Sequence, residues 1–541
     1  TITDANGSKF LFEPLKTVDG ASAKFDVVND YSGLSSIPYT GRGISYSLGD
    51  NTGLRHVFVD SNNVINGQTY YYAVVSYDHG DAELMVAPAE CSKTITVNPE
   101  TGEVLLDVNT LSIIPRPVTA GYVSSLIDGA GLVQIQGNGT GLASLEIIDH
   151  TAVQDDNNFK IIFNEDNGLN YSVLDEKNIS DTITVRLGQY HKLSHKNVDT
   201  TSFSLTSLDG SQFTNGIDFD ILYSDGQILI PNDALITEGQ VVIAIYQYYP
   251  ISNSKKLASE EGNPIFDGMT LTVQNEELEL DESKIGWNTT SLNNWTADVK
   301  PFNNLPVNKY PADYEIRWFD TPVSSNYRPG YEYVKANFEV WETTRGFPEK
   351  QIPFLIVENI STDSLWNPGE RIILLRDSTT SSYAWELTFY EPADGDTVSP
   401  IVGDVFSIFT NRTFIDDIFT FSTTSAKEQN TIEKENMKEI YVVPNPYVVS
   451  SSIEPLDLQN PQDRGPRRVY FANLPANCTI NIYTMIGDLV TSLNHNSSID
   501  DGIEYWDLTT SDNFPVSFGM YIFHVKSENG NESIGRFAII K

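Results

Sequence analysis

The residues that could perform chemistry are few and scattered along this sequence. Among the seven histidines, only His191 and His195 have a spacing that suits metal ligation, because on a helix they would share one face. They lie in a segment that reads as a loop between strands, so a solvated pair is favoured over a metal site. The sequence has no Gly-x-Ser-x-Gly elbow, phosphate-binding glycine loop or His-Glu-x-x-His motif. We therefore expect no enzymatic activity and neither catalytic nor cofactor-binding residues.

Two acidic turns contain oxygen ligands of the kind that calcium prefers. Residues 155–158 read Asp-Asp-Asn-Asn, and residues 164–168 read Asn-Glu-Asp-Asn-Gly. Neither segment has the full ordered calcium-binding loop, and such residues are common at the tips of polar β-turns. We therefore expect no cofactor and no metal-binding residues, with a structural calcium ion as the alternative left open.

Tryptophan side chains could form a stacking platform for a glycan. Trp318 and Trp385 lie within strands in which apolar and polar residues alternate, so one face of each strand is expected to be buried. Packing in the core is therefore favoured over a sugar-binding surface for these two residues. The same interpretation extends to Trp341 and Trp366.

The charge and the cysteine content narrow the possible partners. Acidic residues outnumber basic ones by 73 to 34, which gives a net charge of −39. This charge opposes binding to nucleic-acid phosphates, so we expect no nucleic-acid partner. The cysteines Cys91 and Cys478 lie in different predicted modules, and no disulfide between them is expected. No apolar run reaches the roughly 18 residues of a membrane span, and the chain begins at Thr1 without a signal segment. We interpret it as a mature or partial chain.

The elements that must position these residues are β-strands. Apolar and polar residues alternate in short runs separated by turn residues, and no stretch keeps helical apolar spacing over three turns. This pattern predicts an all-β protein of tandem β-sandwich modules joined by proline-containing linkers. The middle modules are expected at 119–275 and 311–424, with a linker or extended arm at 276–310 and a further linker at 425–439.

The N-terminal module is marked by a long aromatic strand. Its alternation places Tyr70, Tyr72 and Val74 on one face, after a turn that contains glycine. This run resembles the late strands of a fibronectin type III domain. The resemblance implies that Tyr70 is the corner tyrosine, whose hydroxyl bonds to the backbone upstream. We place this module, complete or partial, at residues 1–98 and a linker at 99–118.

The C-terminal segment carries the most informative pattern. Two prolines around an asparagine stiffen the chain before a first edge strand. A hairpin, a tryptophan-containing strand, a strand that starts at a glycine and a terminal strand follow, which predicts a small antiparallel, immunoglobulin-like β-sandwich at 440–541. The residues that mark these features are Pro444, Asn445, Pro446, Gly487, Trp506, Gly519, Tyr521 and Lys541.

This order of motifs resembles the C-terminal sorting domain of type IX secretion cargo. In that family the domain is the address read by an outer-membrane export machine, and it is often removed while the passenger is attached to surface lipopolysaccharide. The chain departs from the family pattern at Phe518, where a small residue is usual, and it retains the domain as far as Lys541. Cleavage is therefore left open. The simpler alternative is a sandwich module with no sorting role.

Together these patterns predict an extracellular or cell-surface protein, exported across the outer membrane, with a structural or adhesive role. The implied partner is the type IX secretion machinery, and copies of the chain, other surface proteins or glycans are further candidates. Two alternatives remain. The modules could be the spacer and sorting region of a large secreted enzyme with an upstream catalytic domain, or subunits of an extracellular filament or sheath.

Overall fold

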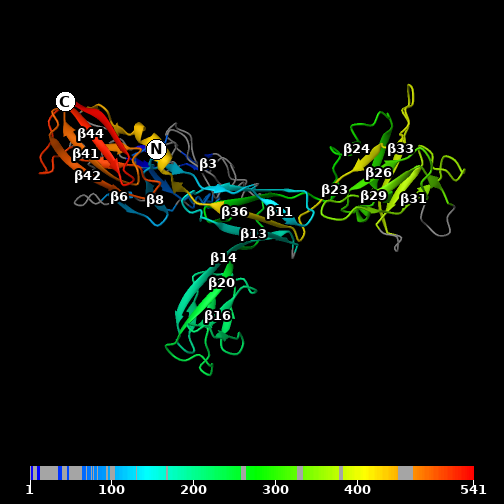
Figure 1. Ribbon diagram of the computed structural model, residues 1–541, viewed down its shortest axis with the longest axis horizontal. Coiled ribbons are helices and arrows are strands. Elements are labelled where there is room, and N and C mark those ends of the chain that lie inside the picture. The colour runs from blue at the N-terminus through cyan, green and yellow to red at the C-terminus, as the bar shows by residue number, and fades with distance from the viewer. Residues whose placement is uncertain are drawn as a thin grey trace.

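The protein is built almost entirely from β-strands, as the sequence predicts. The computed structural model shows an elongated molecule with a lobe at each end and a third lobe that projects from its middle (Figure 1). The described α-helix, α1 (Asn430–Asn436), has seven residues. The structure describes residues 64–540 apart from 69, 75, 77, 82, 90, 93–94, 98–103, 130, 166–167, 258–262, 326–332, 377–381 and 449–466, and before them only the backbone of β1 (Ile2–Thr3), β2 (Lys9–Leu11), β3 (Leu34–Pro38) and β4 (Ser45–Ser47).

A central domain lies between the three lobes, and strand β36 (Ile418–Thr424) lies inside its main sheet. β36 pairs with β13 (Asn157–Asn164) on one side and with two short strands on the other. Its alternation directs Phe419 and Phe421 into a core where Phe421 stacks on Phe159 at a centroid distance of 5.0 Å. The remaining strands are β10 (Leu126–Ile127), β11 (Val133–Gln136), the first part of β14 (Asn170–Thr184), the last part of β20 (Val241–Ser254), β12 (Leu142–Ile147), β21 (Ile265–Phe266) and β22 (Met269–Gln274).

The projecting lobe is carried by two strands that run on from the central sheet. β14 has 15 residues and β20 has 14, more than twice the usual length of a strand. Their far halves pair from Ile179 to Thr184 and enclose a separate core that includes Ile228 and Tyr246. The lobe is completed by β15 (Tyr190–Lys192), β16 (Ser204–Ser207), β17 (Gln212–Phe213), β18 (Asp220–Leu222) and β19 (Gln227–Leu229).

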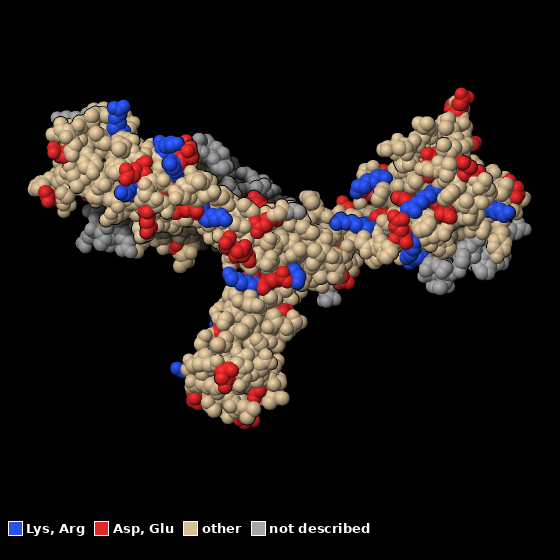
Figure 2. Space-filling model, viewed as in Figure 1, with Lys and Arg blue, Asp and Glu red and all other residues tan. Residues whose placement is uncertain are grey.

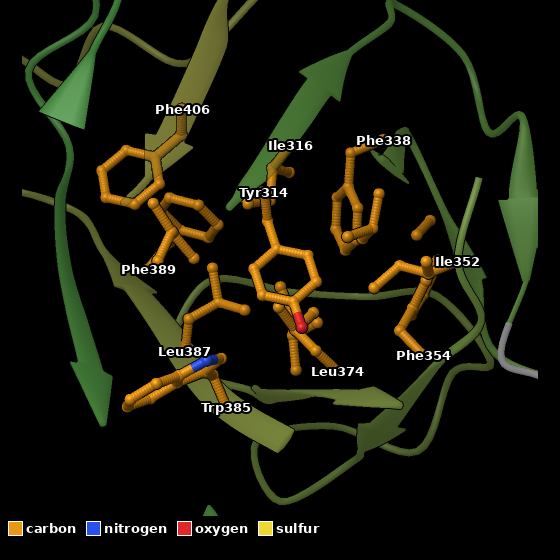
Figure 3. Packing of buried hydrophobic residues seen from close by; sticks show 14 of the residues in the cluster. Tyr314, Ile316, Phe338, Ile352, Phe354, Leu374, Trp385, Leu387, Phe389 and Phe406 are labelled. Atoms are coloured by element: carbon orange, nitrogen blue, oxygen red, sulfur yellow. The ribbon is translucent and has the colours of Figure 1, made fainter. Parts of the chain in front are cut away.

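The lobe at the end of the molecule opposite the C-terminus, called the end lobe, is a β-sandwich whose two sheets have five and four strands (Figure 1). Tyr314 and Ile316 from the first sheet face Leu374 and Leu387 from the second (Figure 3). The first sheet contains β24 (Gly286–Trp287), β34 (Val405–Ile408), β26 (Tyr314–Trp318), β29 (Phe338–Glu342) and β30 (Lys350–Gln351), and the second contains β25 (Thr296–Pro301), β33 (Tyr383–Tyr390), β32 (Arg371–Leu375) and β31 (Phe354–Val357). Smaller pairs are β23 (Glu279–Leu280) with β35 (Thr410–Asn411) and β27 (Ser324–Ser325) with β28 (Lys335–Ala336).

The domain limits in the middle of the chain differ from those expected. Residues 276–310 are not a linker, because they contain β24 and β25, the edge strands of the end lobe, with Trp295 buried in its core. Their polar composition reflects the solvated faces of edge strands. Residues 119–275 form two cores, because β14 and β20 each pass through both. Residues 311–424 do not form one module, because β36 returns to the central sheet.

The C-terminal domain is a β-sandwich of three and five strands. Its terminal strand β45 (Glu532–Ile540) lies inside the larger sheet, between β44 (Gly519–Ser527) and the edge strand β39 (Tyr447–Val448). Residues 425–439, expected as a linker, contain β37 and α1, and Glu433 of α1 is bonded to this domain. The smaller sheet contains β38 (Tyr441–Val443), β40 (Val469–Ala472) and β43 (Glu504–Trp506), the larger contains β39 (Tyr447–Val448), β45 (Glu532–Ile540), β44 (Gly519–Ser527), β41 (Asn477–Thr484) and β42 (Leu489–Asn496), and β37 (Lys427–Glu428) pairs with β9 (Tyr122–Val123).

The N-terminal elements lie beside the C-terminal domain (Figure 1). β5 (Tyr70–Ala73) pairs with β8 (Thr110–Ile113), and β6 (Ile95–Val97) pairs with β7 (Val104–Leu106). β7 and β8 fall within residues 99–118, which were expected to be a linker. The prolines that follow these strands dominate the local sequence pattern. The two strands have only three and four residues, so they could not be recognised beside these prolines. Much of the expected module at 1–98 lies outside the described residues.

A buried ion pair fixes the end lobe to the central domain. Arg412 Nη1 lies 2.6 Å from Asp313 Oδ1, and both side chains are buried. Arg412 Nε also donates to the carbonyl of Asn138 at 2.8 Å, and the Asp313 carboxylate accepts the Thr410 amide at 2.9 Å. A buried charge that loses its partner is strongly destabilising. The two domains can therefore meet in only a narrow range of arrangements.

Two carboxyl groups, those of Asp175 and Asp267, lie at the joint between the central domain and the projecting lobe. Asp175 pairs with Tyr248 where β14 and β20 change from one core to the other, and the register of the two strands shifts on both sides of this pair. Burial raises the pKa of Asp267 to about 6, and the Asp175 carboxylate adds to this effect, while Lys177 and Gln154 oppose it. One oxygen of each carboxyl has no hydrogen-bond partner. The joint therefore favours a protonated Asp267.

This joint makes stability depend on pH through Asp267. The folded chain holds the proton more tightly than the unfolded chain, so the ionisation of Asp267 should destabilise the fold progressively as the pH rises from about 4 to 6. Replacing Asp267 with Asn removes this ionisation and should stabilise the joint at pH 7.5 by about 2 kcal/mol, with little effect at pH 4. Calorimetric melting at the two pH values measures the difference.

The matched control for this experiment is Asp220→Asn, a change at an exposed position of the projecting lobe. This variant should melt like the unaltered protein at both pH values. If Asp267→Asn and the unaltered protein show the same pH dependence, Asp267 ionises freely in the folded state and the joint is not linked to pH.

Candidate functional site: the C-terminal domain

Several residues of the predicted sorting motif contact the terminal strand β45. Phe537 and Ile539 point into the core and Ile540 is exposed, while β45 pairs with β44 as far as Ile539. The terminal strand expected in this segment is therefore confirmed, and alternate side chains along its second half are buried. Lys541, the last motif residue, lies outside the described residues.

The Pro-Asn-Pro segment carries the chain from one sheet of the sandwich to the other. It leaves β38 in the smaller sheet and enters β39, which pairs in parallel with β45 through Tyr447 and Ile539. The side-chain Oδ1 of Asn445 accepts the Ala538 amide of β45 at 3.1 Å. Pro444 and Pro446 have no amide donor, so this crossing needs no partner for either position. The asparagine thus bonds the segment to the terminal strand.

Trp506 and Tyr521 form a buried aromatic cluster with Phe537. The Tyr521 and Phe537 rings stack at 5.8 Å, and Trp506 meets both edge-on at 6.2 and 5.9 Å. Trp506 Nε1 donates to the Thr509 carbonyl at 2.9 Å, and the Tyr521 hydroxyl donates to the Ser517 carbonyl at 2.6 Å. These polar atoms are satisfied inside the domain, so the two motif residues stabilise the sandwich.

The motif glycines lie at turns and strand ends. Gly487 has a φ of 95° in the turn between β41 and β42, a conformation that glycine adopts readily. Gly519 begins β44 and pairs with Ile539 of β45. Phe518, where the resemblance leads one to expect a small residue, is exposed beside this pair. The large side chain of Phe518 therefore fits at this position because it extends into solvent.

Tyr70 lies outside the C-terminal domain, on β5. Its hydroxyl accepts the Ile65 amide at 2.9 Å, a bond to the backbone five residues upstream. This is the bond that a tyrosine corner makes. The role of Tyr70 within a complete fibronectin-like module stays a prediction, because much of that module lies outside the described residues.

In the projecting lobe, Ser194 and Asp181 meet near His195. Ser194 Oγ donates to Asp181 at 2.6 Å and Tyr246 Oη donates to it at 2.7 Å. Burial opposes ionisation of this carboxyl, yet the bonds from Ser194 and Tyr246 outweigh it and lower the pKa of Asp181. A serine nucleophile would bond to the histidine instead. His191 is bonded separately to the backbone of Arg186 at 3.1 Å.

The other candidate residues have structural surroundings. Trp318, Trp366 and Trp385 are buried in the end lobe, which confirms their packing in the core. Trp341 is partly buried, and the Arg317 guanidinium lies over its ring at 4.9 Å. In the acidic segment 155–158, Asp155 accepts the Ser425 amide at 3.0 Å. Part of the second acidic segment, 164–168, lies outside the described residues.

A cavity of about 330 Å³ in the C-terminal domain is lined by two arginines, and Arg468 lies over the Tyr505 ring at 4.4 Å. Acidic side chains are spread over every lobe, and no continuous basic track crosses the face shown in Figure 2. The described residues contain no group of three or more histidine, cysteine or acidic side chains placed to hold a metal ion. No helix in the same residues is long and apolar enough to span a membrane.

Comparisons with known proteins give only distant neighbours. No family model and no curated protein matches the chain. PorZ, described as an essential bacterial surface component of the type-IX secretion system of Porphyromonas gingivalis, aligns over 62% of this chain and 51% of its own, with 12% identity and a TM-score of 0.17. Dimeric latent PorU of the same organism aligns over 51% and 36%, with 11% identity and a TM-score of 0.14.

A third solved structure, a tetra-tandem repeat in the extending region of a large adhesion protein, aligns over 88% of this chain and 93% of its own. The identity is 11% and the TM-score is 0.11. At these TM-scores, none of the three neighbours assigns a function or a shared overall architecture. The chain spans about half of PorZ and 36% of PorU.

A substitution at Gly535 tests how tightly the core of the C-terminal domain is packed. It pairs with Phe523 across β44 and β45, and a methyl group at Gly535 would overlap the Phe523 ring. We expect Gly535→Ala to destabilise the domain by about 1 to 3 kcal/mol, because an overpacked core strains its side chains. Hydrogen exchange of the β44 and β45 amides in the whole chain measures this loss.

Two further variants make the test specific. Phe523→Leu combined with Gly535→Ala should recover part of the lost protection, because the smaller side chain leaves room for the methyl group. Ser533→Ala, two positions earlier on the same strand, should change little. Equal protection in Gly535→Ala and the unaltered chain would mean that the two strands lie further apart than described.

Proposed function

We propose that the chain is an exported surface protein whose C-terminal domain is a type IX secretion address and whose other domains form a structural or adhesive scaffold. The observation that supports the address most directly is that three motif residues contact the terminal strand. Asn445 bonds to β45, while Trp506 and Tyr521 pack on its Phe537. An export machine that reads this domain would therefore recognise a folded sandwich built around the last strand.

The scaffold role is supported by how the lobes are joined. The buried Arg412 and Asp313 pair holds the end lobe, and the uninterrupted strands β14 and β20 hold the projecting lobe. Such joints keep three surfaces at fixed positions, which suits display or adhesion better than a chemical cycle that needs opening and closing. The target of an adhesive surface would be another surface protein, a glycan or a further copy of the chain.

We also propose that this chain is not an enzyme. Purified protein should give no turnover above background on panels of glycoside, ester and peptide substrates. Ser194 is bonded to a carboxylate and not to a base, and Ser497, which lies 2.9 Å from His495 Nε2, donates its hydroxyl to the Asp501 carbonyl. Ser194→Ala provides the comparison. Turnover that follows the purified protein and disappears in Ser194→Ala would assign catalysis to the projecting lobe and contradict the proposal.

The address can be tested by removing residues 537–541. The deletion takes away the buried Phe537 and Ile539, whose burial is worth on the order of 3 to 6 kcal/mol, a large share of the stability of a small domain. We expect the C-terminal domain to unfold and the protein to accumulate in the periplasm while the upstream domains stay folded. Fractionation of producing cells, with trypsin resistance of the upstream domains as a second measurement, gives the outcome.

Ile540→Ala and Lys541→Ala are the controls, since Ile540 is exposed and both changes retain the buried pair. Both should reach the surface like the full-length chain. If the truncated protein also reaches the surface or medium at the full-length level, the C-terminal domain is a structural module and the sorting proposal is wrong.

A further inference from the structure

The C-terminal domain carries a bound segment from the other half of the chain. This segment, residues 115–121, is called the connector. Thr119 donates its amide to the Ile499 carbonyl at 3.0 Å, and Ala120 donates to the Leu474 carbonyl at 2.9 Å. In return, the Gly502 amide donates to the carbonyl of Pro117 at 2.8 Å. The connector is thus held by backbone bonds in both directions.

Side chains complete the contact. Ala120 is 0% exposed and belongs to the hydrophobic core of the C-terminal domain. Arg116 forms an ion pair with Asp501, and Thr119 Oγ1 donates to the Ile499 carbonyl at 2.9 Å. The connector therefore fills a place in the core that the C-terminal domain does not fill with its own residues.

The fit is close enough to require glycine at Gly502. A Cβ atom there would lie 2.6 Å from the Val118 carbonyl oxygen, which belongs to the backbone and cannot move aside cheaply. A second close approach lies next to the connector, where the Tyr470 hydroxyl donates to the Asn66 carbonyl at 3.1 Å. The bound surface therefore extends from the connector to the turn before β5.

Helix α1 closes over the end of the connector. A Cβ atom on Gly121 would lie 2.9 Å from Glu433 Cβ, and the Gln429 amide donates to the Gly121 carbonyl at 2.9 Å. Glu433 is buried, and its two oxygens accept the side-chain amides of Asn529 and Asn531 at 2.6 and 2.8 Å. A buried carboxylate with two donors is a specific arrangement, because the loss of either donor would leave a charge unsatisfied.

We infer that the connector is a ligand of the C-terminal domain: the surface formed by Leu474, Ile499 and Gly502 binds an extended segment with a small side chain at position 120, and it keeps that segment after the chain is cut. The N-terminal part and the C-terminal domain then stay together without a covalent link through the central domain. This inference does not depend on the sorting role.

The test uses the full chain with a specific protease site inserted between Gly129 and Gly131, where a Cβ atom on either glycine would meet open space. After cutting, residues 1–129 should elute with the rest of the protein on size exclusion at micromolar concentration. Dilution series monitored by fluorescence anisotropy of a label on this fragment give its dissociation constant. Separation of the fragment from the cut but otherwise unaltered protein would overturn the inference.

Gly502→Val and Ala120→Leu probe the surface from its two sides. Each should raise the dissociation constant of the cut protein by about tenfold or more, because an added side chain overpacks a filled site. The Ala120→Leu substitution lies on the N-terminal fragment, residues 1–129, which is released on dissociation. Its effect therefore cannot come from unfolding of the C-terminal domain. Asp500→Val, which places the same side chain at an exposed neighbouring position, should leave the constant unchanged.

Strands β9 and β10 also lie on the released fragment and pair with β37 and β36. If these strand pairs alone held the fragment, the dissociation constant of the cut Ala120→Leu protein would equal that of the cut unaltered protein. That result would overturn the inference, whatever the behaviour of Gly502→Val.

Discussion

The structure depends on strand β36 finding partners that precede it by about half of the chain. Thr420 of β36 bonds to Phe159 of β13, 261 positions away, and the same strand pairs on its other side with β10 and β11. Until this strand is in place, the phenylalanines of β13 lack cover and the main sheet lacks a member. The entropy of closing such a long loop grows only slowly with its length, so two whole lobes can be inserted before β36.

Buried polar groups give this closure its precision. Asp417, at the start of β36, is 0% exposed and accepts the amides of Gly139 and Ile415 at 3.0 and 2.8 Å. Beside it, Arg412 bridges the central domain and the end lobe. Apolar alternation alone would tolerate a slip of two residues, which keeps the same face buried, whereas a displaced buried carboxylate would lose its donors. The same reasoning applies to Glu433 at the connector.

The sequence predicts features that local patterns control. The alternation of the last strand identifies Phe537 and Ile539 as buried, and turn residues identify the hairpin around Gly487. Local periodicity says nothing about which distant strand is the partner, so the return of Ile418–Thr424 to the central sheet and the joining of two cores by Asn170–Thr184 could not be read from it. The edge strand at Thr296–Pro301 was hidden by its solvated composition, although Trp295 before it was a signal of burial.

The continuous strands β14 and β20 also determine how the projecting lobe carries mechanical load. A pull on its tip is directed along the two strands, and the backbone bonds between them lie across that direction. The load is therefore carried by two covalent backbones in parallel, whereas a lobe joined by a loop would swing about that loop. A surface that grips something through this lobe would transmit tension directly into the central sheet.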